Sequence, residues 1–209
     1  MAGKTRRKAA APLEDRILEA AMDMAEETGW DNLRLHEVAE ALGISLADLL
    51  SHYRDLDGVA DAWFTRAWRA MLAEPPEGFD DLPARERLFL LMMRWFDALA
   101  PRRAVTADMI RTKLYPSHPH HWVPMIFNLS RTIQWLRDAA HLDAGGRRRM
   151  LEEVGLSTLF LATLRVWMSD DSPEQERTRA YLERRLNRAD RVMARLYRSR
   201  SETDQQSGA

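Results

Sequence analysis

Residues 33–57 read LRLHEVAEALGISLADLLSHYRDLD, and the expected fold is organised around this segment. Apolar residues at helical spacing from Leu35 to Leu42 predict a helix with one apolar face. Gly43 stands where that helix should end, because a residue without a Cβ atom adopts the left-handed conformation at little cost. Ser45 can cap a second helix, and Asp48 three residues later completes a capping arrangement. Two short helices joined by a tight glycine turn are typical of a helix-turn-helix unit, with an ordinary helical hairpin as the alternative. We expect the second helix to make its apolar contacts through Leu46, Leu49 and Leu50.

The flanking residues extend this pattern. The segments RILEAAMDMAEETGW (16–30), LRLHEVAEALGIS (33–45) and LLSHYRDLDGVADAWF (49–64) together resemble the DNA-binding domain of the TetR family of transcriptional repressors. The resemblance implies that the first helix packs on the two-helix unit and that the helix Leu46–His52 enters the major groove of DNA. The residues it places toward DNA are Arg34, Ser45, Leu46, Asp48, Ser51, His52 and Tyr53, with Arg6 and Arg7 from a basic N-terminal arm.

Three positions of this segment depart from the family pattern. Leu50 replaces a tyrosine that usually contacts a phosphate, Leu56 replaces a lysine with the same role, and Leu46 stands where a basic residue or glycine is usual. Between Asp31 and Gly58 there are six acidic residues and two arginines, which gives a net charge of −4. Phosphate contacts supply most non-specific DNA affinity, so this surface favours DNA only if the acids face inward or away.

The composition of the 209-residue chain narrows the class of protein. No apolar run approaches the roughly 18 residues that span a bilayer, and the first residues lack the apolar core of a secretory signal. The absence of cysteine excludes disulfides and thiolate chemistry. A reducing compartment is consistent with that absence, and we expect a cytoplasmic protein. Seven Trp and eleven Met hint at an irregular apolar space such as a pocket, although plain core filling explains them too.

The whole chain reads as helical. We expect an all-α, TetR-like fold of about nine helices, because no alternating strand pattern occurs and Pro75, Pro76 and Gly78 divide two helical parts. The later helices are predicted at 82–99, 105–114, 125–140, 147–168 and from a capping box at Ser172 to about Tyr197. The expected domains are a basic arm (1–12), a helix-turn-helix domain (13–74), a ligand-binding and dimerisation domain (75–199) and a disordered tail (200–209).

The C-terminal third carries a second resemblance. Residues 156–186, LSTLFLATLRVWMSDDSPEQERTRAYLERRL, are similar to the end of the coenzyme Q biosynthesis lipid-binding family. That family has a TetR-like fold, has lost DNA binding, holds an isoprenoid-type lipid and is partner to a membrane-associated hydroxylase. The positions that carry the similarity are Trp167, Asp170, Asp171, Ser172, Thr178, Tyr181, Leu182 and Arg185.

Residue patterns for catalysis or metal binding are weak. His118, His120 and His121 lack the spacing and the neighbouring ligands of a metal site, so we expect a surface loop or pocket rim, no metal and no cofactor. Asp170 and Asp171 are explained by the dipole of the helix that follows. We therefore expect no enzyme. The predicted ligand pocket is lined by apolar residues of the middle helices: Met92, Trp95, Phe96, Met109, Trp122, Ile126, Leu129, Phe160, Leu164 and Trp167.

Two functions stay open from the sequence. The first is a homodimeric DNA-binding regulator, expected to be a repressor, that responds to a small hydrophobic ligand and pairs through its last two helices. The second is a DNA-incompetent, lipid-binding accessory protein with a membrane-associated enzyme as partner. The arginines at 147–149 and along the last helix fit acidic lipid or a partner, but a solvated face that pairs with nearby glutamates is the default interpretation.

Overall fold

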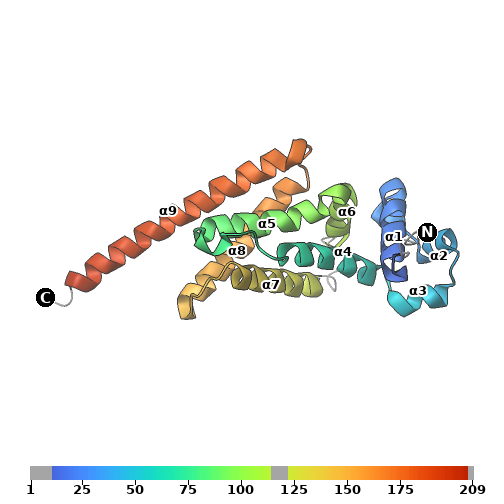
Figure 1. Ribbon diagram of the computed structural model, residues 1–209, viewed down its shortest axis with the longest axis horizontal. Helices are drawn as coiled ribbons and strands as arrows, with labels where there is room; N and C mark the ends of the chain where they lie inside the picture. Colours follow the sequence, from blue (N-terminus) through green and yellow to red (C-terminus); the bar gives the residue numbers. More distant parts are fainter. Residues whose placement is uncertain (1–10, 114–121, 207–209) are drawn as a thin grey trace, which may run out of the picture. The chain divides into compact units, whose positions relative to one another are not determined.

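The computed structural model describes residues 11–113 and 122–206, with side chains described throughout these ranges except at 122–127 and 192–206. All α-helical elements in this part of the chain are shown in Figure 1, and no strand occurs among the described residues. The predicted all-α fold of about nine helices is confirmed. The helices are α1 (Leu13–Thr28), α2 (Leu35–Leu42), α3 (Leu46–His52), α4 (Leu56–Met71), α5 (Ala84–Leu99), α6 (Arg103–Lys113), α7 (Trp122–Ala139), α8 (Gly146–Trp167) and α9 (Glu176–Gln206).

The described chain forms two compact units. The first contains residues 11–66 and 102–112, and the second contains residues 67–101, 113 and 122–206. Helix α4 contributes residues to both units. The domain boundary near residue 75 that the sequence indicates stays a prediction about which parts fold independently. None of the helices in the described ranges is long and apolar enough to cross a membrane.

The first unit is built on α1, which packs on α2, while α2 packs on α3 (Figure 1). Ile17 and Ala21 of α1 are fully buried, as is Val38 of α2. Trp63 of α4 donates from its indole nitrogen to Thr106 Oγ1 at 2.8 Å, a buried hydrogen bond that ties α4 to α6. These contacts hold the helix-turn-helix on a fixed support.

Two arginines form ion pairs with acidic residues along one face of α1. Arg66 pairs with Asp15 and Glu19, and Arg102 pairs with Asp23 and Glu26. The acids recur every three to four residues, so they share one face of the helix. The sequence shows this acidic ladder, but not which arginines complete it, since Arg66 and Arg102 lie more than forty residues away.

The second unit has an aromatic core. Trp95 and Phe96 of α5 meet Phe160 and Trp167 of α8, with ring centroids 5.0 to 5.7 Å apart. Stacked and edge-to-face rings at this spacing are in direct contact, so they fill the space between the two helices. Helix α9 packs on α8 and α5, and α7 packs on the same two helices.

The turn from α8 into α9 differs from the predicted capping box. The sequence predicts Ser172 as the cap of a helix that begins at Pro173. Instead a short 3-10 turn, Pro173–Gln175, follows Ser172, and α9 begins at Glu176, after Gln175 with a positive φ of 61°. The buried carboxylate of Asp170 takes the capping role, because it accepts from Ser172 N at 3.0 Å and from Thr178 N at 2.8 Å. Burial alone would raise the pKa of Asp170, but the hydrogen bonds from Ser172 and Thr178 outweigh it and lower the pKa to about 2.

A series of side-chain hydrogen bonds also connects the residues around this turn. Trp167 Nε1 donates to Gln175 Oε1 at 2.6 Å, and Gln175 Nε2 donates to Asp97 Oδ1 at 2.7 Å. Arg179 of α9 binds both oxygens of Asp97 at 2.7 and 2.8 Å. The series links α5, α8 and α9, and it gives the indole of the buried Trp167 its polar partner.

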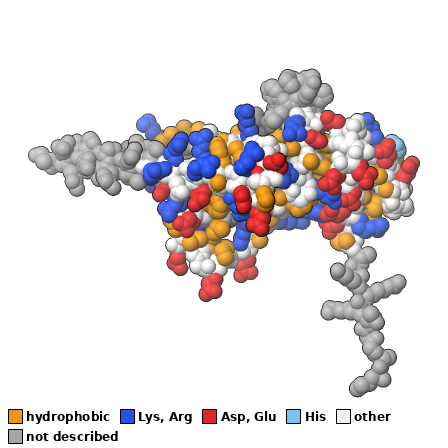
Figure 2. Space-filling view, turned by 90° about the horizontal axis from the view of Figure 1, so that it is seen from above, with side chains coloured by type: hydrophobic (Ala, Val, Ile, Leu, Met, Phe, Trp, Pro, Cys, Tyr) orange, Lys and Arg blue, Asp and Glu red, His pale blue; other side chains and the backbone are white. Residues whose placement is uncertain are grey.

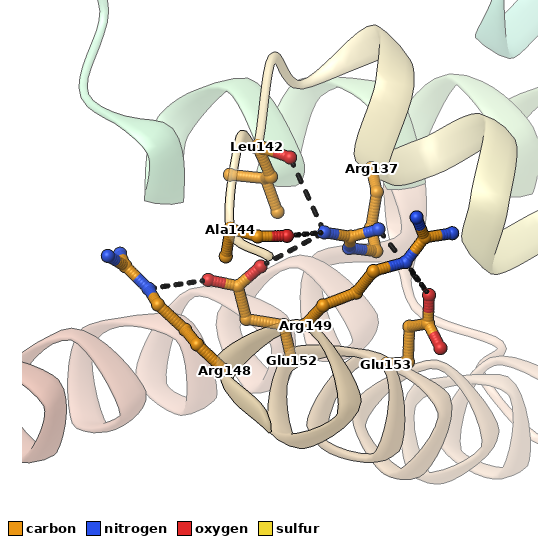
Figure 3. Close-up of polar contacts among 7 residues, drawn as sticks. All are labelled: Arg137, Leu142, Ala144, Arg148, Arg149, Glu152 and Glu153. Atoms are coloured by element: carbon orange, nitrogen blue, oxygen red, sulfur yellow. Dashed lines mark hydrogen bonds and ion pairs between the residues drawn. The ribbon is translucent and has the colours of Figure 1, made fainter. Parts of the chain in front are cut away.

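The turn from α7 into α8 is organised by a buried arginine (Figure 3). The side chain of Arg137 is only 4% exposed, and its Nη2 donates to the carbonyl oxygens of Leu142 and Ala144 at 3.4 and 3.2 Å. Its guanidinium also pairs with Glu152 and Glu153, each at 3.4 Å. A buried charge must be compensated in this way, since an unpaired one would be expensive to desolvate.

Two of the three arginines at 147–149 form ion pairs within α8. Arg148 pairs with Glu152 at 3.2 Å and Arg149 with Glu153 at 2.8 Å, both at the i, i+4 spacing of a helix face (Figure 3). These are the carboxylates that hold Arg137. The default interpretation of a face paired with nearby glutamates therefore describes Arg148 and Arg149.

Two further segments differ from the sequence-based expectation. The expected polar tail continues as helix, because α9 runs to Gln206 and no glycine or proline interrupts the chain before Gly208. Helix α7 starts at Trp122, three residues earlier than predicted, since proline is tolerated in the first turn and Pro124 falls there. His118, His120 and His121 lie outside the described residues.

The Asp170 cap gives a pH-dependent prediction. The folded pKa of about 2 lies below the value of about 3.9 in an unfolded chain, so the carboxylate stabilises the fold above pH 4 and loses its contribution as the pH falls toward 2. Asp170→Asn should lower the free energy of unfolding at pH 7 by about 2 kcal/mol. Urea denaturation of both proteins at pH 7 and at pH 4 to 3 should show the difference shrinking on acidification. Equal stability at pH 7 would contradict the cap. Asp171→Asn, which changes an exposed neighbour, is the matched control.

Candidate nucleic-acid interface

The turn between α2 and α3 requires a glycine. Gly43 adopts φ 65° and ψ 34°, the left-handed conformation, and its N–H donates to Glu40 O at 3.0 Å. Ile44 N donates to Ala39 O at 3.0 Å, which closes the end of α2. A residue with a Cβ atom pays a conformational penalty at this φ, so the sequence at 43 sets the turn.

The start of α3 is fixed by a reciprocal cap, as predicted. Asp48 N donates to Ser45 Oγ at 3.1 Å, while Ser45 N and Oγ donate to Asp48 Oδ2 at 3.1 and 2.7 Å. These hydrogen bonds, led by that from the Ser45 hydroxyl, lower the pKa of Asp48, so its carboxylate is ionised at neutral pH.

The two faces of α3 differ from the prediction. Only Leu49 and Tyr53, one helical turn apart, face the interior, at 2% and 4% exposure. Leu46 and Leu50 are 55% and 60% exposed, so the prediction that they supply interior contacts is wrong. A helix of seven residues that packs on α2 buries one face only, and the i, i+4 pair Leu46 and Leu50 shares the outer face.

Tyr53 is an interior residue rather than a surface one. Its hydroxyl donates to the carbonyl oxygen of Glu14 at 3.3 Å. Burial, with a smaller effect from the charge of Glu14, raises the pKa of Tyr53 to about 12. Its predicted DNA contact would need the ring to leave this position, so we omit Tyr53 from the proposed surface.

The other predicted DNA contacts lie at the surface where they are described. Arg34, Ser45, Leu46, Asp48, Ser51 and His52 are exposed. Arg34 Nη1 donates to Asp31 O and Leu33 O, both at 3.1 Å, which holds the guanidinium against the backbone just before α2. Arg6 and Arg7 lie outside the described residues, so their part in binding stays a prediction.

Three of the six acids of this segment, Asp31, Asp48 and Asp55, make hydrogen bonds that hold the local structure. Asp48 caps α3, and Asp55 Oδ1 accepts from Gly58 N at 2.8 Å at the start of α4, which lowers the pKa of Asp55. Asp31 Oδ1 accepts from the hydroxyl of Thr112. These contacts explain why the carboxylates are present, but they leave the negative charge on the surface. On the face of the molecule that Figure 2 displays, acidic side chains are mixed with Lys, Arg and hydrophobic side chains.

Four of the ten predicted ligand-lining residues pack on one another. Trp95, Phe96, Phe160 and Trp167 form the aromatic core described above, and Met92 is fully buried in the same unit. Leu129 and Leu164 are half-buried, while Met109 is fully buried in the first unit. The side chains of Trp122 and Ile126 lie outside the described residues, so a pocket among these ten residues stays a prediction.

A different hollow occurs on the first unit. It is an open cleft of about 600 Å³ whose lining includes Asp15, Glu19, Asp23 and Arg66, together with Leu42. Its charged lining belongs to the ion-paired side of α1. It is therefore not the apolar pocket that the sequence predicts.

The fold and this site together define a helical protein with a helix-turn-helix unit. The structure of the TetR transcriptional regulator from Nitrosomonas europaea ATCC 19718 is 40% identical to this chain, with a TM-score of 0.77, and the alignment covers 86% of this chain and 98% of that one. This chain belongs to the TetR family of transcriptional regulators. The TetR regulator from Rhodococcus sp. RHA1, at 19% identity, 86% and 96% coverage and a TM-score of 0.58, shares the fold.

Two further comparisons concern the sequence. The family model described as COQ9 matches residues 152–193, which run from α8 into α9. This match confirms the C-terminal similarity seen in the sequence, over a fifth of the chain. A search of curated proteins gave no significant match.

The cap of α3 can be tested by its stability contribution. Ser45→Ala removes the hydroxyl that accepts from Asp48 N, and loss of an N-cap of this kind costs about 1 kcal/mol. The free energy of unfolding, measured by urea denaturation, should fall by that amount. Ser51→Ala is the matched control, because its hydroxyl donates only to the carbonyl oxygen of Asp48, inside the same helix. Equal losses in the two variants would refute a special role for the cap.

Proposed function

We propose that this protein is a homodimeric DNA-binding repressor whose operator affinity is controlled by a small hydrophobic ligand. The observation that carries the proposal is the exposed outer face of α3, held by the Gly43 turn and the Ser45–Asp48 cap in a chain of the TetR family. In a helix-turn-helix protein this helix reads the major groove. The proposal assigns the protein no catalytic activity and a cytoplasmic location.

The proposed DNA-contact surface consists of the outer face of α3 and its immediate flanks. Its members are Arg34, Ser45, Leu46, Asp48, Leu50, Ser51 and His52, with Arg6 and Arg7 from the N-terminal arm. Since α3 and its surroundings carry net negative charge, the basic arm is needed for phosphate contacts. The arm holds four basic residues and no acid before Pro12.

The proposed dimer surface lies on α8. Met150, Leu151 and Val154 are 64%, 71% and 61% exposed, and Leu161 two turns further is 48% exposed. These residues follow helical spacing, so they form one apolar stripe along the helix. A Cβ atom built on Gly155 meets nothing within 4 Å, which leaves room for a second helix to approach closely. An apolar stripe of this kind suits a self-complementary twofold interface, with α9 beside it.

Ligand control follows from dimer geometry. Two recognition helices of a dimer must match half-sites about one DNA turn apart. A ligand that binds one arrangement of the protomers better than the other shifts the population toward it and so changes operator affinity. We place the ligand among apolar side chains of the second unit, near the half-buried Leu129 and Leu164.

The second candidate function is a lipid-binding accessory protein that has lost DNA binding. The match of residues 152–193 to the COQ9 model favours it, as do the leucines at positions 50 and 56, where the resemblance implies phosphate-binding residues. In this alternative the apolar interior of the second unit holds a lipid, and a membrane-associated enzyme is the partner.

A reciprocal pair of variants tests the two surfaces. Leu50→Glu places a charge on the outer face of α3 and should abolish retention of genomic DNA fragments at low salt while the protein stays a dimer. Leu151→Glu places the same charge on the stripe of α8 and should give a monomer. Analytical ultracentrifugation and a gel-shift assay measure both properties. A Leu151→Glu protein that stays dimeric would contradict the assigned interface.

Two measurements on the wild-type protein distinguish the two candidate functions. The repressor should retain DNA at low salt, with affinity falling steeply as salt rises, since phosphate contacts release counterions. The accessory protein should retain none, and native mass spectrometry should find a lipid bound to it. Absence of any DNA retention at 50 mM salt or below would remove the repressor.

A further inference from the structure

We propose that α3 reads its operator through the methyl groups of thymine, with Leu46 and Leu50 as the reading side chains. The proposal rests on the DNA-binding function given above and names the base chemistry that this surface recognises. Thymine alone presents a methyl group in the major groove, and apolar side chains recognise it there.

The residue content of α3 excludes the usual hydrogen-bonded readout. The helix LADLLSH contains no Arg, Lys, Asn or Gln, the side chains that make two-point contacts with guanine or adenine. A recognition helix without them must discriminate bases by other contacts, apart from what His52 at its last position can reach.

The other polar side chains of α3 are already engaged within the helix. Asp48 accepts two hydrogen bonds from Ser45, and the hydroxyl of Ser45 is spent on that contact. The hydroxyl of Ser51 donates to the carbonyl oxygen of Asp48 at 2.6 Å. For Ser45 or Ser51 to donate to a base edge, its hydroxyl would have to give up the hydrogen bond that it makes within this segment.

The apolar side chains are the ones presented outward. Leu46 and Leu50 are more than half exposed, although both are large and apolar. At i, i+4 spacing they lie on the same face, with Cβ atoms about 5 to 6 Å apart. Bases along one strand rise by about 3.4 Å, so the pair can span thymines one or two steps apart. Ala47, exposed beside them, leaves room for the methyl groups.

This arrangement also fits the charge of the segment. Apolar contacts with methyl groups need no positive charge on α3, whereas the carboxylate of Asp48 would oppose phosphate contacts at the same place. Sequence discrimination and phosphate affinity are then supplied by different parts of the protein, the first by α3 and the second by the basic arm.

The test removes the methyl group from the DNA. Duplexes are selected by the full-length protein from a random-sequence pool at low salt, and the enriched sequences are resynthesised with deoxyuridine in place of each thymidine. Uracil pairs as thymine does but lacks the methyl. Affinity should fall about fourfold for each contacted methyl lost, the factor that corresponds to burying one such group.

Matched variants locate the contact. In Leu50→Ala, replacing thymidine by deoxyuridine should no longer lower the affinity at one position of the duplex, and in Leu46→Ala at a neighbouring position. Leu72→Ala, which alters an exposed leucine just beyond α4, should keep the loss of affinity at both positions. Circular dichroism checks that each variant is folded, which the exposure of Leu46 and Leu50 predicts.

Each outcome has one interpretation. The thymine proposal is overturned if the enriched positions of the selected duplexes hold no thymine, or if the thymidine and deoxyuridine duplexes bind with equal affinity. Either result leaves the proposed repressor function standing. Binding without any enrichment overturns the thymine proposal in the same way. Retention of no duplex at low salt removes the repressor function, and the thymine proposal falls with it.

Discussion

The reciprocal hydrogen bonds between Ser45 and Asp48 fix the residue at which α3 begins, and the candidate interface depends on that register. With Gly43 in the left-handed conformation and Ser45 as the cap, Leu49 and Tyr53 face inward and Leu46 and Leu50 face outward. A rotation of the helix by one residue, about 100°, would change which of these side chains face inward. The acid at position 48 is therefore explained by the cap, even though its charge opposes phosphate.

In the second unit, charged side chains with several hydrogen-bond partners likewise fix the turns at both ends of α8. Arg137 binds Glu152 and Glu153 at the N-terminal turn, and Asp170 caps the turn that follows the C-terminal end. Buried charges with several partners specify one geometry, because any other leaves a charge unpaired. The aromatic core holds the middle of the helix. Helix α8 is thus a well-fixed support for the apolar stripe that we assign to the dimer, and the COQ9 match falls on this region.

Periodicity and capping signals predicted most helices from the sequence, because each is a local property. The Gly43 turn and the Ser45 cap both follow from residues within a few positions. The outward position of Leu50 was not predicted, and Leu46 was assigned both to apolar contacts and to the DNA side, since apolar residues ordinarily read as interior and only packing shows which face of a short helix is covered. The buried position of Arg137 was not predicted, because its partners include two carbonyl oxygens of a turn, which carry no sequence signal. The ligand pocket remains a prediction for the same reason: apolar residues alone do not distinguish a cavity from a solid core.

Hydrogen–deuterium exchange of the full-length protein, with and without a duplex that it selects, tests the central assignment most directly. Backbone amides of residues 34–53 should be protected in the complex, with the stripe of α8 protected in both states. Protection that spares residues 34–53 while the duplex is bound would contradict the assignment of the α3 face as the DNA-contact surface.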